Sequence, residues 1–123
     1  MVVRSVVSVV DDDESVRESL PDLLQELGFS AKAFSSARHF LGSEWLSLTQ
    51  CLILDVAMPD MTGPELQREL QRRRLEIPIV FITARADDTI RQRLLAQGAK
   101  ECLYKPFSQT ALLEAINIAL RVE

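Results

Sequence analysis

Short apolar runs alternate with amphipathic segments along this 123-residue chain, and this alternation limits the fold more than any other feature. Four runs are typical of buried strands, because they are nearly continuous in apolar residues and each stops at a polar one. A shorter and more mixed segment is typical of an edge strand. In chain order, the strands are predicted at 4–10, 29–34 (the edge strand), 51–55, 77–83 and 101–104.

Apolar residues at helical spacing fill the segments between these strands. In the segment 14–27 they recur at every third or fourth position, with Asp13 as the predicted N-cap and Gly28 directly after the predicted end. Pro21 lies inside this helix and cannot donate a backbone hydrogen bond, so a kink is expected there. Further helices are predicted at 35–41, 64–74, 87–97 and from Ser108 towards the end of the chain.

The alternation predicts five β/α units in one domain that spans residues 1–123. Strands that are apolar on both sides need cover on both faces of their sheet. We therefore predict a doubly wound α/β fold, with a five-stranded parallel sheet flanked by five helices. A chain of this length buries one core without disulfides.

Composition excludes several classes of protein. A formal net charge of −4 and a pI near 5.0 argue against direct nucleic-acid binding by this piece of chain. No apolar run approaches roughly 18 residues, so no membrane-spanning helix is expected. The N-terminus lacks the order of a signal peptide, so a cytoplasmic protein is expected. Cys51 and Cys102 lie in apolar runs and are predicted to be buried free thiols.

Polar residues stand where the predicted parallel strands end, and those ends meet at one edge of the sheet. They are Asp11, Asp12, Asp55, Thr83 and Lys105. In open α/β sheets, ligands bind beyond this edge. Three neighbouring carboxylates repel one another unless a cation lies among them, and hard oxygen ligands without His or Cys favour Mg²⁺.

This set of residue types points to phosphoryl transfer. A carboxylate beside a metal ion can attack a phosphorus centre, while an ammonium and a hydroxyl hold the phosphoryl oxygens. We therefore predict that Asp55 receives a phosphoryl group, with Thr83 and Lys105 contacting it.

Four sequence blocks around these residues resemble the receiver domain of bacterial two-component response regulators, in particular receivers of the FixJ type. The blocks are VVDDDE at 9–14, LILDVAMPDMTG at 52–63, VFITA at 80–84 and LYKPF at 103–107. They follow the family order, and the likeness extends over the whole chain. The resemblance implies a flavodoxin-like sheet with strand order 2-1-3-4-5 and a role in signal transduction.

The resemblance also implies a role for each acidic residue. Asp55 is the implied phosphoacceptor, which takes its phosphoryl group from a sensor histidine kinase. Asp12 is an implied direct ligand of Mg²⁺ together with Asp55, whereas Asp11 acts partly through water and the backbone carbonyl of Ala57 completes the protein ligands. The domain is then a phosphoacceptor rather than an enzyme, with slow self-dephosphorylation at most.

Further implied roles lie next to the acceptor. Thr83 and Lys105 contact the phosphoryl group, and a cis peptide between Lys105 and Pro106 aims the lysine into the site. The second positions after the acceptor and after the threonine tune reactivity in the family, and here they are Ala57 and Arg85.

The chain departs from the family pattern on its last strand. Family receivers often carry an aromatic switch residue three positions before the lysine, where this chain has Cys102. Tyr104 is aromatic, but it directly precedes Lys105 and is expected on the opposite side of the strand by alternation. Our hypothesis is that Thr83 still moves on phosphorylation, with a small packing change at Cys102 replacing the ring movement.

The expected output face comprises the helix from 87, the strand 101–104 and the last helix. Candidate residues on it are Ile90, Arg91, Arg93, Cys102 and Tyr104, with Thr83 as the moving switch residue. In FixJ-like relatives this face supports dimerisation, so phosphorylation-enhanced homodimers are expected. The resemblance also implies a DNA-binding output domain outside this chain, and we expect an excised receiver rather than a stand-alone one.

Two alternatives remain open from the residues. A Mg²⁺-dependent phosphohydrolase of the haloacid dehalogenase type also uses an aspartyl nucleophile, but it carries a second Asp where this chain has Ala57. A degenerate receiver that only binds proteins is the other alternative, and the complete set of five site residues argues against it.

Several other notable residues are interpreted as structural. Asp13 and Glu14 suit the first turn of a helix, and the run Arg72–Arg74 suits the last turn of another. His39 is expected to be structural or exposed, because it lies on a short helix away from the strand ends. Trp45 is expected to pack under a loop.

Overall fold

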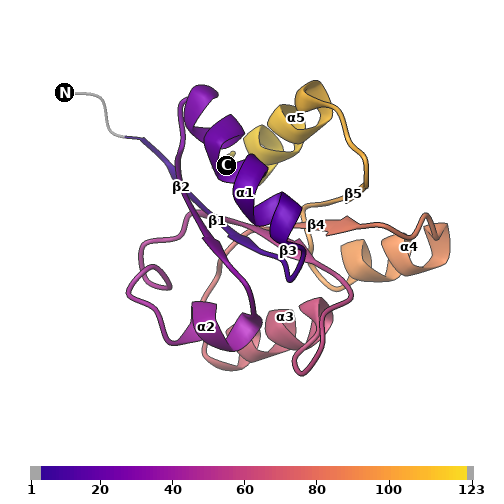
Figure 1. Ribbon diagram of the computed structural model, residues 1–123. Coiled ribbons are helices and arrows are strands. Elements are labelled where there is room, and N and C mark those ends of the chain that lie inside the picture. Colours follow the sequence, from indigo (N-terminus) through magenta and orange to yellow (C-terminus); the bar gives the residue numbers. More distant parts are fainter. Residues whose placement is uncertain (1–3, 122–123) are drawn as a thin grey trace.

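A computed structural model describes residues 4–121 and shows one parallel sheet of five strands (Figure 1). The strands lie in the order β2-β1-β3-β4-β5, as predicted, and every neighbouring pair is parallel. Their bounds are Val6–Val10 for β1, Ser30–Phe34 for β2, Cys51–Asp55 for β3, Ile79–Thr83 for β4 and Glu101–Tyr104 for β5.

Helices cover both faces of this sheet. Helices α1 and α5 lie on one face, with α2, α3 and α4 on the other (Figure 1). The helices are α1 (Glu14–Glu26), α2 (Ala37–Leu41), α3 (Gly63–Arg72), α4 (Asp88–Ala96) and α5 (Gln109–Leu120). No helix within residues 4–121 is long and apolar enough to cross a membrane.

The period-two alternation of the strands divides the interior into two cores. On β3, Leu52 and Leu54 pack on the side of α2 and α3, whereas Cys51 and Ile53 pack on the side of α1 and α5. All five residues of β3 are buried, which explains its continuous apolar sequence. The central strand is therefore held rigidly from both faces up to Asp55, its last residue.

Helix ends follow the signals in the sequence. Asp13 caps α1 by accepting a hydrogen bond from the backbone N–H of Ser15, and α1 runs through Pro21. Thr62 and Glu65 form a capping box at the start of α3. The chain leaves α1 at Gly28, whose φ of +101° lies in the left-handed region that favours glycine.

Three strands are shorter than predicted, and β2 begins at Ser30 rather than residue 29. β1 begins at Val6 rather than residue 4, and β4 begins at Ile79 rather than residue 77. Pro78 precedes β4 and lacks an N–H, so it cannot donate to the sheet, although its carbonyl accepts from the Leu52 N–H at 2.9 Å.

Gly63 lets the N-terminus of α3 approach the end of β3. A Cβ added at Gly63 would lie 2.4 Å from the carbonyl oxygen of Asp55 and 2.9 Å from the ring of Phe81. The Gly63 N–H also donates to the carbonyl of Val56 at 3.0 Å. Only a residue without a side chain fits this contact between backbone segments.

We expect Gly63→Ala to lower the free energy of unfolding by about 2 kcal/mol, because the added methyl group meets backbone that cannot move aside. Gly42→Ala is the matched control, because its Cβ would lie 3.6 Å from the carbonyl oxygen of Arg38, an ordinary van der Waals distance. Urea unfolding followed by circular dichroism measures both. Equal stability of the two variants would contradict this interpretation of Gly63.

Candidate functional site

The acidic site lies at the carboxyl edge of the sheet, where the strands deliver their polar residues. Asp11 and Asp12 directly follow β1, Asp55 ends β3, and Thr83 ends β4. Lys105 directly follows β5. Because all the strands run in the same direction, residues more than 90 positions apart in sequence meet at this edge.

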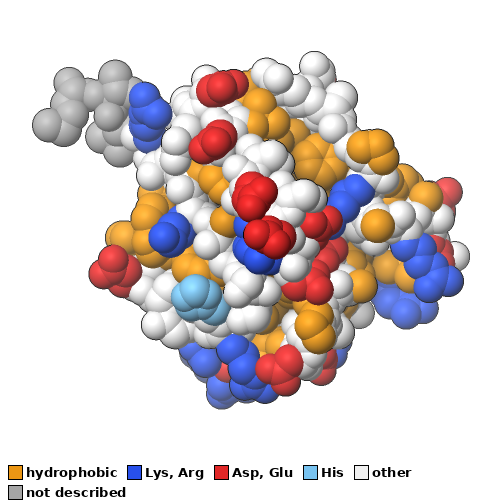
Figure 2. Space-filling view, viewed as in Figure 1, with side chains coloured by type: hydrophobic (Ala, Val, Ile, Leu, Met, Phe, Trp, Pro, Cys, Tyr) orange, Lys and Arg blue, Asp and Glu red, His pale blue; other side chains and the backbone are white. Residues whose placement is uncertain are grey.

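The structure brings together the three carboxylates predicted from the sequence. Oxygen atoms of Asp11, Asp12 and Asp55 all lie within 4.8 Å of one another. Asp11 and Asp55 are buried, whereas Asp12 is exposed. Acidic side chains also gather on the surface at this end of α1 (Figure 2). The cluster is therefore enclosed by protein on one side and open to solvent on the other.

Lys105 supplies the positive charge inside the cluster. Its Nζ donates to Asp11 Oδ2 at 2.8 Å and lies 3.7 Å from Asp55 Oδ1. Burial acts to lower the pKa of Lys105, but the hydrogen bond to Asp11 and the charges of Asp55 and Asp11 outweigh it, so the pKa is raised. Lys105 is therefore charged at neutral pH and partly neutralises two acids.

One lysine does not compensate for three carboxylates. Burial, followed by the negative charge of Asp11, raises the pKa of Asp55 to about 7, against the opposing effect of Lys105. The surroundings of Asp55 thus disfavour its ionisation, and any cation placed beside it favours its charged form.

A backbone N–H and an arginine side chain hold Asp11 in place, a feature that the sequence interpretation missed. Its Oδ1 accepts from the Asp13 N–H at 2.9 Å, and its carbonyl accepts from Arg17 Nη1 at 3.1 Å. The spacing of two residues between Asp11 and Asp13 is that of an Asx turn, which is the sequence signal for this contact.

The donor set fits Mg²⁺. It consists of hard carboxylate oxygens, and the described cluster includes neither His nor Cys. Asp11, Asp12 and Asp55 would hold the ion, and the exposed side of the cluster leaves room for the water ligands that Mg²⁺ retains. Ala57 is exposed two residues beyond Asp55. When bound, the ion would neutralise negative charge on these carboxylates and on a phosphoryl group.

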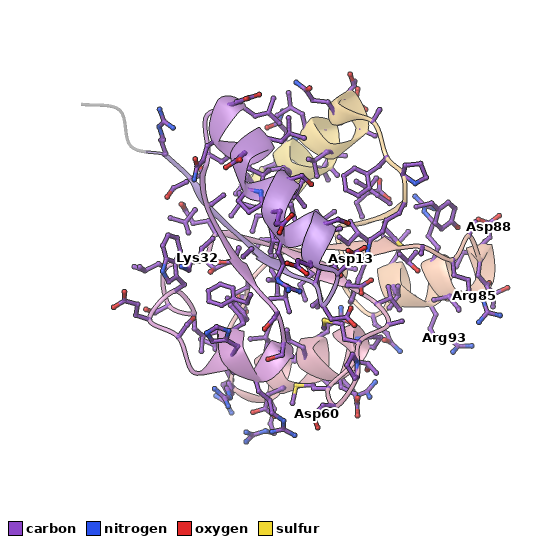
Figure 3. The ribbon with its side chains drawn as sticks, in the orientation of Figure 1. Asp13, Lys32, Asp60, Arg85, Asp88 and Arg93 are labelled. Atoms are coloured by element: carbon purple, nitrogen blue, oxygen red, sulfur yellow. The ribbon has the colours of Figure 1, made fainter. Side chains whose placement is uncertain are left out.

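Thr83 and Lys105 flank this cluster. Thr83 is only 7% exposed, and its Oγ1 accepts from the Arg85 N–H at 3.1 Å, which leaves the hydroxyl proton free to be donated. The peptide between Lys105 and Pro106 is cis. Arg85 is exposed in the connection between β4 and α4 (Figure 3).

The expected position of Tyr104 is wrong. Tyr104 does not lie on the opposite side of β5: its hydroxyl donates to Asp88 of α4 at 2.6 Å, and Cys102 packs in the core on that same side. Leu103 packs in the other core, beside α5. The physical reason is the period of two along a strand, which places residues 102 and 104 on one face.

Polar contacts hold α4 against β5. Arg91 Nη2 donates to Glu101 Oε1 at 2.6 Å, and Arg91 Nε donates to the carbonyl of Cys102 at 3.2 Å. Of the residues of α4, only Leu94 is buried, while Ile90 is half-buried. Helix α4 thus has the fewest buried residues among the four longer helices α1, α3, α4 and α5.

Several predicted structural residues lie away from the acidic site. His39 is exposed on α2 and meets the ring of Phe34 edge-on. Cys51 and Cys102 are buried free thiols, as predicted. Trp45 packs against the core on the α2 side.

The arginine run behaves as expected for the exposed end of a helix. Arg72 and Arg73 form ion pairs with Glu69 at 2.6 and 2.7 Å, and the whole run Arg72–Arg74 is exposed.

Comparison with known proteins identifies relatives of the whole domain. Residues 7–117 match the family model of the response regulator receiver domain. Nodulation protein W of Bradyrhizobium diazoefficiens is 42% identical over 116 residues, covering 94% of this chain and 51% of that protein. The response regulator protein TodT of Pseudomonas putida is 41% identical, covering 96% of this chain and 52% of its own length. The transcriptional regulatory protein FixJ of Rhizobium meliloti is 38% identical, and the match covers 92% of this chain and 55% of FixJ.

Solved structures agree with these relatives. The response regulator StyR is 46% identical with a TM-score of 0.86, covering 96% of this chain and 60% of that one. FixJ-N is 35% identical with a TM-score of 0.86, and 99% of each chain is covered. The chain thus spans about half the length of the curated relatives it matches, and nearly all of the FixJ-N structure.

The raised pKa of Asp55 predicts a particular dependence of stability on pH. Without divalent cations, the folded state holds a proton on Asp55 that the unfolded state releases near its ordinary pKa, so this group's contribution to stability falls as pH rises from about 4 to 7. We expect Asp55→Asn to be more stable than the unchanged chain by about 2 kcal/mol at pH 8, and nearly equal at pH 4.

Urea unfolding in a chelator at several pH values measures this difference. Asp22→Asn is the matched control, because Asp22 is exposed on α1 and far from the cluster along the helix. If the free energy of unfolding changed with pH in the same way for the unchanged chain and Asp55→Asn, the carboxyl group at position 55 would not be the one that titrates.

Proposed function

The chain belongs to the response regulator receiver domain family, and from this premise we propose that Asp55 accepts a phosphoryl group from the phosphohistidine of a sensor histidine kinase. The observation that carries the proposal is the position of Asp55 at the end of the buried strand β3, beside Asp11, Asp12 and Lys105. Such a receiver domain transmits a signal and does not turn over a metabolite. This role agrees with the transcriptional regulators among its relatives.

The transfer breaks the bond between phosphorus and the imidazole nitrogen and forms one between phosphorus and a carboxylate oxygen of Asp55. Asp55 must be ionised to attack, and both Lys105 and a metal ion held by the three carboxylates favour that form. The phosphoryl oxygens then find donors in the Lys105 ammonium and the free hydroxyl proton of Thr83.

Phosphorylation is proposed to act on the contacts between α4 and β5. A phosphoryl group attracts Thr83, whose Oγ1 now accepts from the Arg85 N–H at the start of the connection to α4. Since α4 has one buried residue and is held by Arg91 and Tyr104, a small rearrangement shifts the population between two positions of the helix. Cys102 replaces the usual aromatic switch with a smaller packing change.

The whole protein is proposed to regulate transcription in the cytoplasm. This chain spans about half of relatives such as the transcriptional regulatory protein FixJ. We propose that a DNA-binding output domain lies outside this chain and responds to the α4–β5–α5 face. Residues 1–123 then act as the receiver domain and do not themselves contact nucleic acid or membrane.

Intact mass spectrometry after incubation with acetyl phosphate and Mg²⁺ tests the acceptor. We expect the mass of one phosphoryl group to be added, and the adduct to disappear when a chelator replaces Mg²⁺. Asp55→Asn should lose the adduct and Asp22→Asn should retain it, because Asp22 is exposed on α1 outside the cluster. An equally modified Asp55→Asn protein, or no modification of the unchanged chain, would refute the proposal.

Sedimentation of the phosphorylated and free forms at equal concentration tests the output face. We expect phosphorylation to tighten homodimerisation by about tenfold, a typical size for coupling between two sites. Ile90→Asp on α4 should abolish this gain, whereas Leu48→Asp, at a residue 54% exposed outside that face, should not. Identical sedimentation of both forms would contradict a role in dimerisation.

A further inference from the structure

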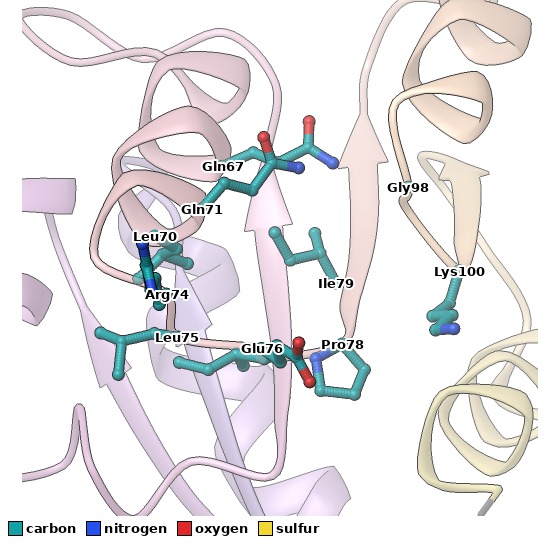
Figure 4. Close-up of a pocket in the computed structure, with 11 residues that line it drawn as sticks. Gln67, Leu70, Gln71, Arg74, Leu75, Glu76, Pro78, Ile79, Gly98 and Lys100 are labelled. Atoms are coloured by element: carbon teal, nitrogen blue, oxygen red, sulfur yellow. The ribbon is translucent and has the colours of Figure 1, made fainter.

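A cleft of about 590 Å³ opens at the amino edge of the sheet. Its walls are the C-terminal half of α3, the segment 74–79 and the loop that leads into β5 (Figure 4). Ile79, the first residue of β4, lines the cleft, whereas Thr83, the last residue of β4, belongs to the acidic site. The two sites therefore lie at opposite ends of the same strand, and the cleft volume is in the range of small-molecule sites.

The floor of the cleft is apolar. Leu70 and Ile79 are 2% and 4% exposed and belong to the core on this face of the sheet. Leu75 and Ile77 are half-buried beside them, and Pro78 closes the lower side in the view shown (Figure 4). Such a floor binds the apolar body of a ligand through burial of surface.

Gln67 contributes a polar group that lacks a partner. The side chain is only 3% exposed, and its Nε2 donates to the carbonyl of Gln97 at 3.3 Å. Gln71 Nε2 donates to that same carbonyl at 3.2 Å. Within residues 4–121, Gln67 Oε1 has no hydrogen-bond donor, and a buried acceptor without one is costly. This oxygen has almost no accessible surface, so an O–H or N–H group of a ligand would satisfy it once the side-chain amide turns towards the cleft.

Two cations flank the cleft on opposite sides (Figure 4). Arg74 follows α3 and Lys100 precedes β5, and neither side chain forms an ion pair with any residue that the structure describes. Glu76 is the single acidic residue in the lining. Cations therefore outnumber acids around an apolar floor, which favours an anionic ligand.

We propose that this cleft binds a small carboxylic acid with one or two rings that also carries a hydroxyl or amino donor. The rings would lie on the apolar floor and the carboxylate would meet Arg74 or Lys100. The donor would meet Gln67 Oε1 after the amide of that side chain turns towards the cleft. The cleft has room for such a molecule but not for a folded element of a partner protein. The binding uses none of the residues of the proposed phosphorylation site, so it stands or fails independently.

NMR titration of the isotope-labelled chain, in a chelator and without a phosphodonor, tests the proposal. The probes are 4-hydroxybenzoate, benzoate without the donor and 4-hydroxybenzamide without the charge. We expect saturable shifts of the backbone amides of Gln71, Leu75, Gly98 and Lys100, with amides at the acidic site unchanged. The affinity for 4-hydroxybenzoate should exceed that for either of the other two probes by at least about fivefold.

Variants separate the two polar contacts. Arg74 and Lys100 are exposed, so their replacement should not disturb the fold. At least one of Arg74→Gln and Lys100→Gln should weaken the affinity for 4-hydroxybenzoate by about tenfold. Gln67→Met should remove the preference for 4-hydroxybenzoate over benzoate while retaining benzoate binding. Arg93→Gln, at an exposed arginine on α4 outside the cleft (Figure 3), is the matched control and should bind like the unchanged chain.

Three results would each overturn the proposal. One is the absence of saturable shifts with all three probes up to about 10 mM, the limit of useful affinity. Another is equal binding of the neutral amide and the acid. The third is binding by 4-hydroxybenzoate that neither Arg74→Gln nor Lys100→Gln weakens.

Discussion

The repulsion between buried carboxylates at one edge of the sheet is the interaction on which the rest of this domain depends. Asp11 and Asp55 lie side by side with a single lysine between them, at 2.8 and 3.7 Å. The folded state tolerates this cluster because β1 and β3 are buried on both faces and hold their ends in place. The stability of the two cores thus supports a site that is short of positive charge, and a cation placed among the carboxylates would relieve their repulsion.

Apolar burial also differs between the centre of the sheet and helix α4. β3, β4 and their helices are joined by buried apolar contacts, and Gly63 brings the backbone of α3 directly against Asp55. Helix α4 depends instead on Arg91 and Tyr104, whose hydrogen bonds exchange readily with water. Under the proposed function, a change of charge at the carboxyl edge would act first on this helix, which has the least apolar burial.

Sequence patterns were sufficient to predict the parallel sheet, the helix caps and the residues at the strand ends, because hydrophobic periodicity and capping act through local rules. The strand order came from the resemblance to the receiver family. One local rule was misapplied, and two contacts were not predicted. Tyr104 was placed on the wrong side of β5, although the period of two already assigns it to the side of Cys102. The contact of Asp11 with the Asp13 N–H and the approach of Gly63 to Asp55 were not foreseen.

The sequence by itself determined which residues occupy the carboxyl ends of the strands, because burial of an apolar run places its first polar residue at the edge. Only the tertiary structure decided how these groups share charge, since Lys105 meets Asp11 across 94 positions of chain and its distance from Asp55 depends on the packing of β1, β3 and β5. The cleft beside Gln67 is likewise invisible in the sequence. Its walls come from separate segments that are brought together when α3 and the loop before β5 pack on one face of the sheet.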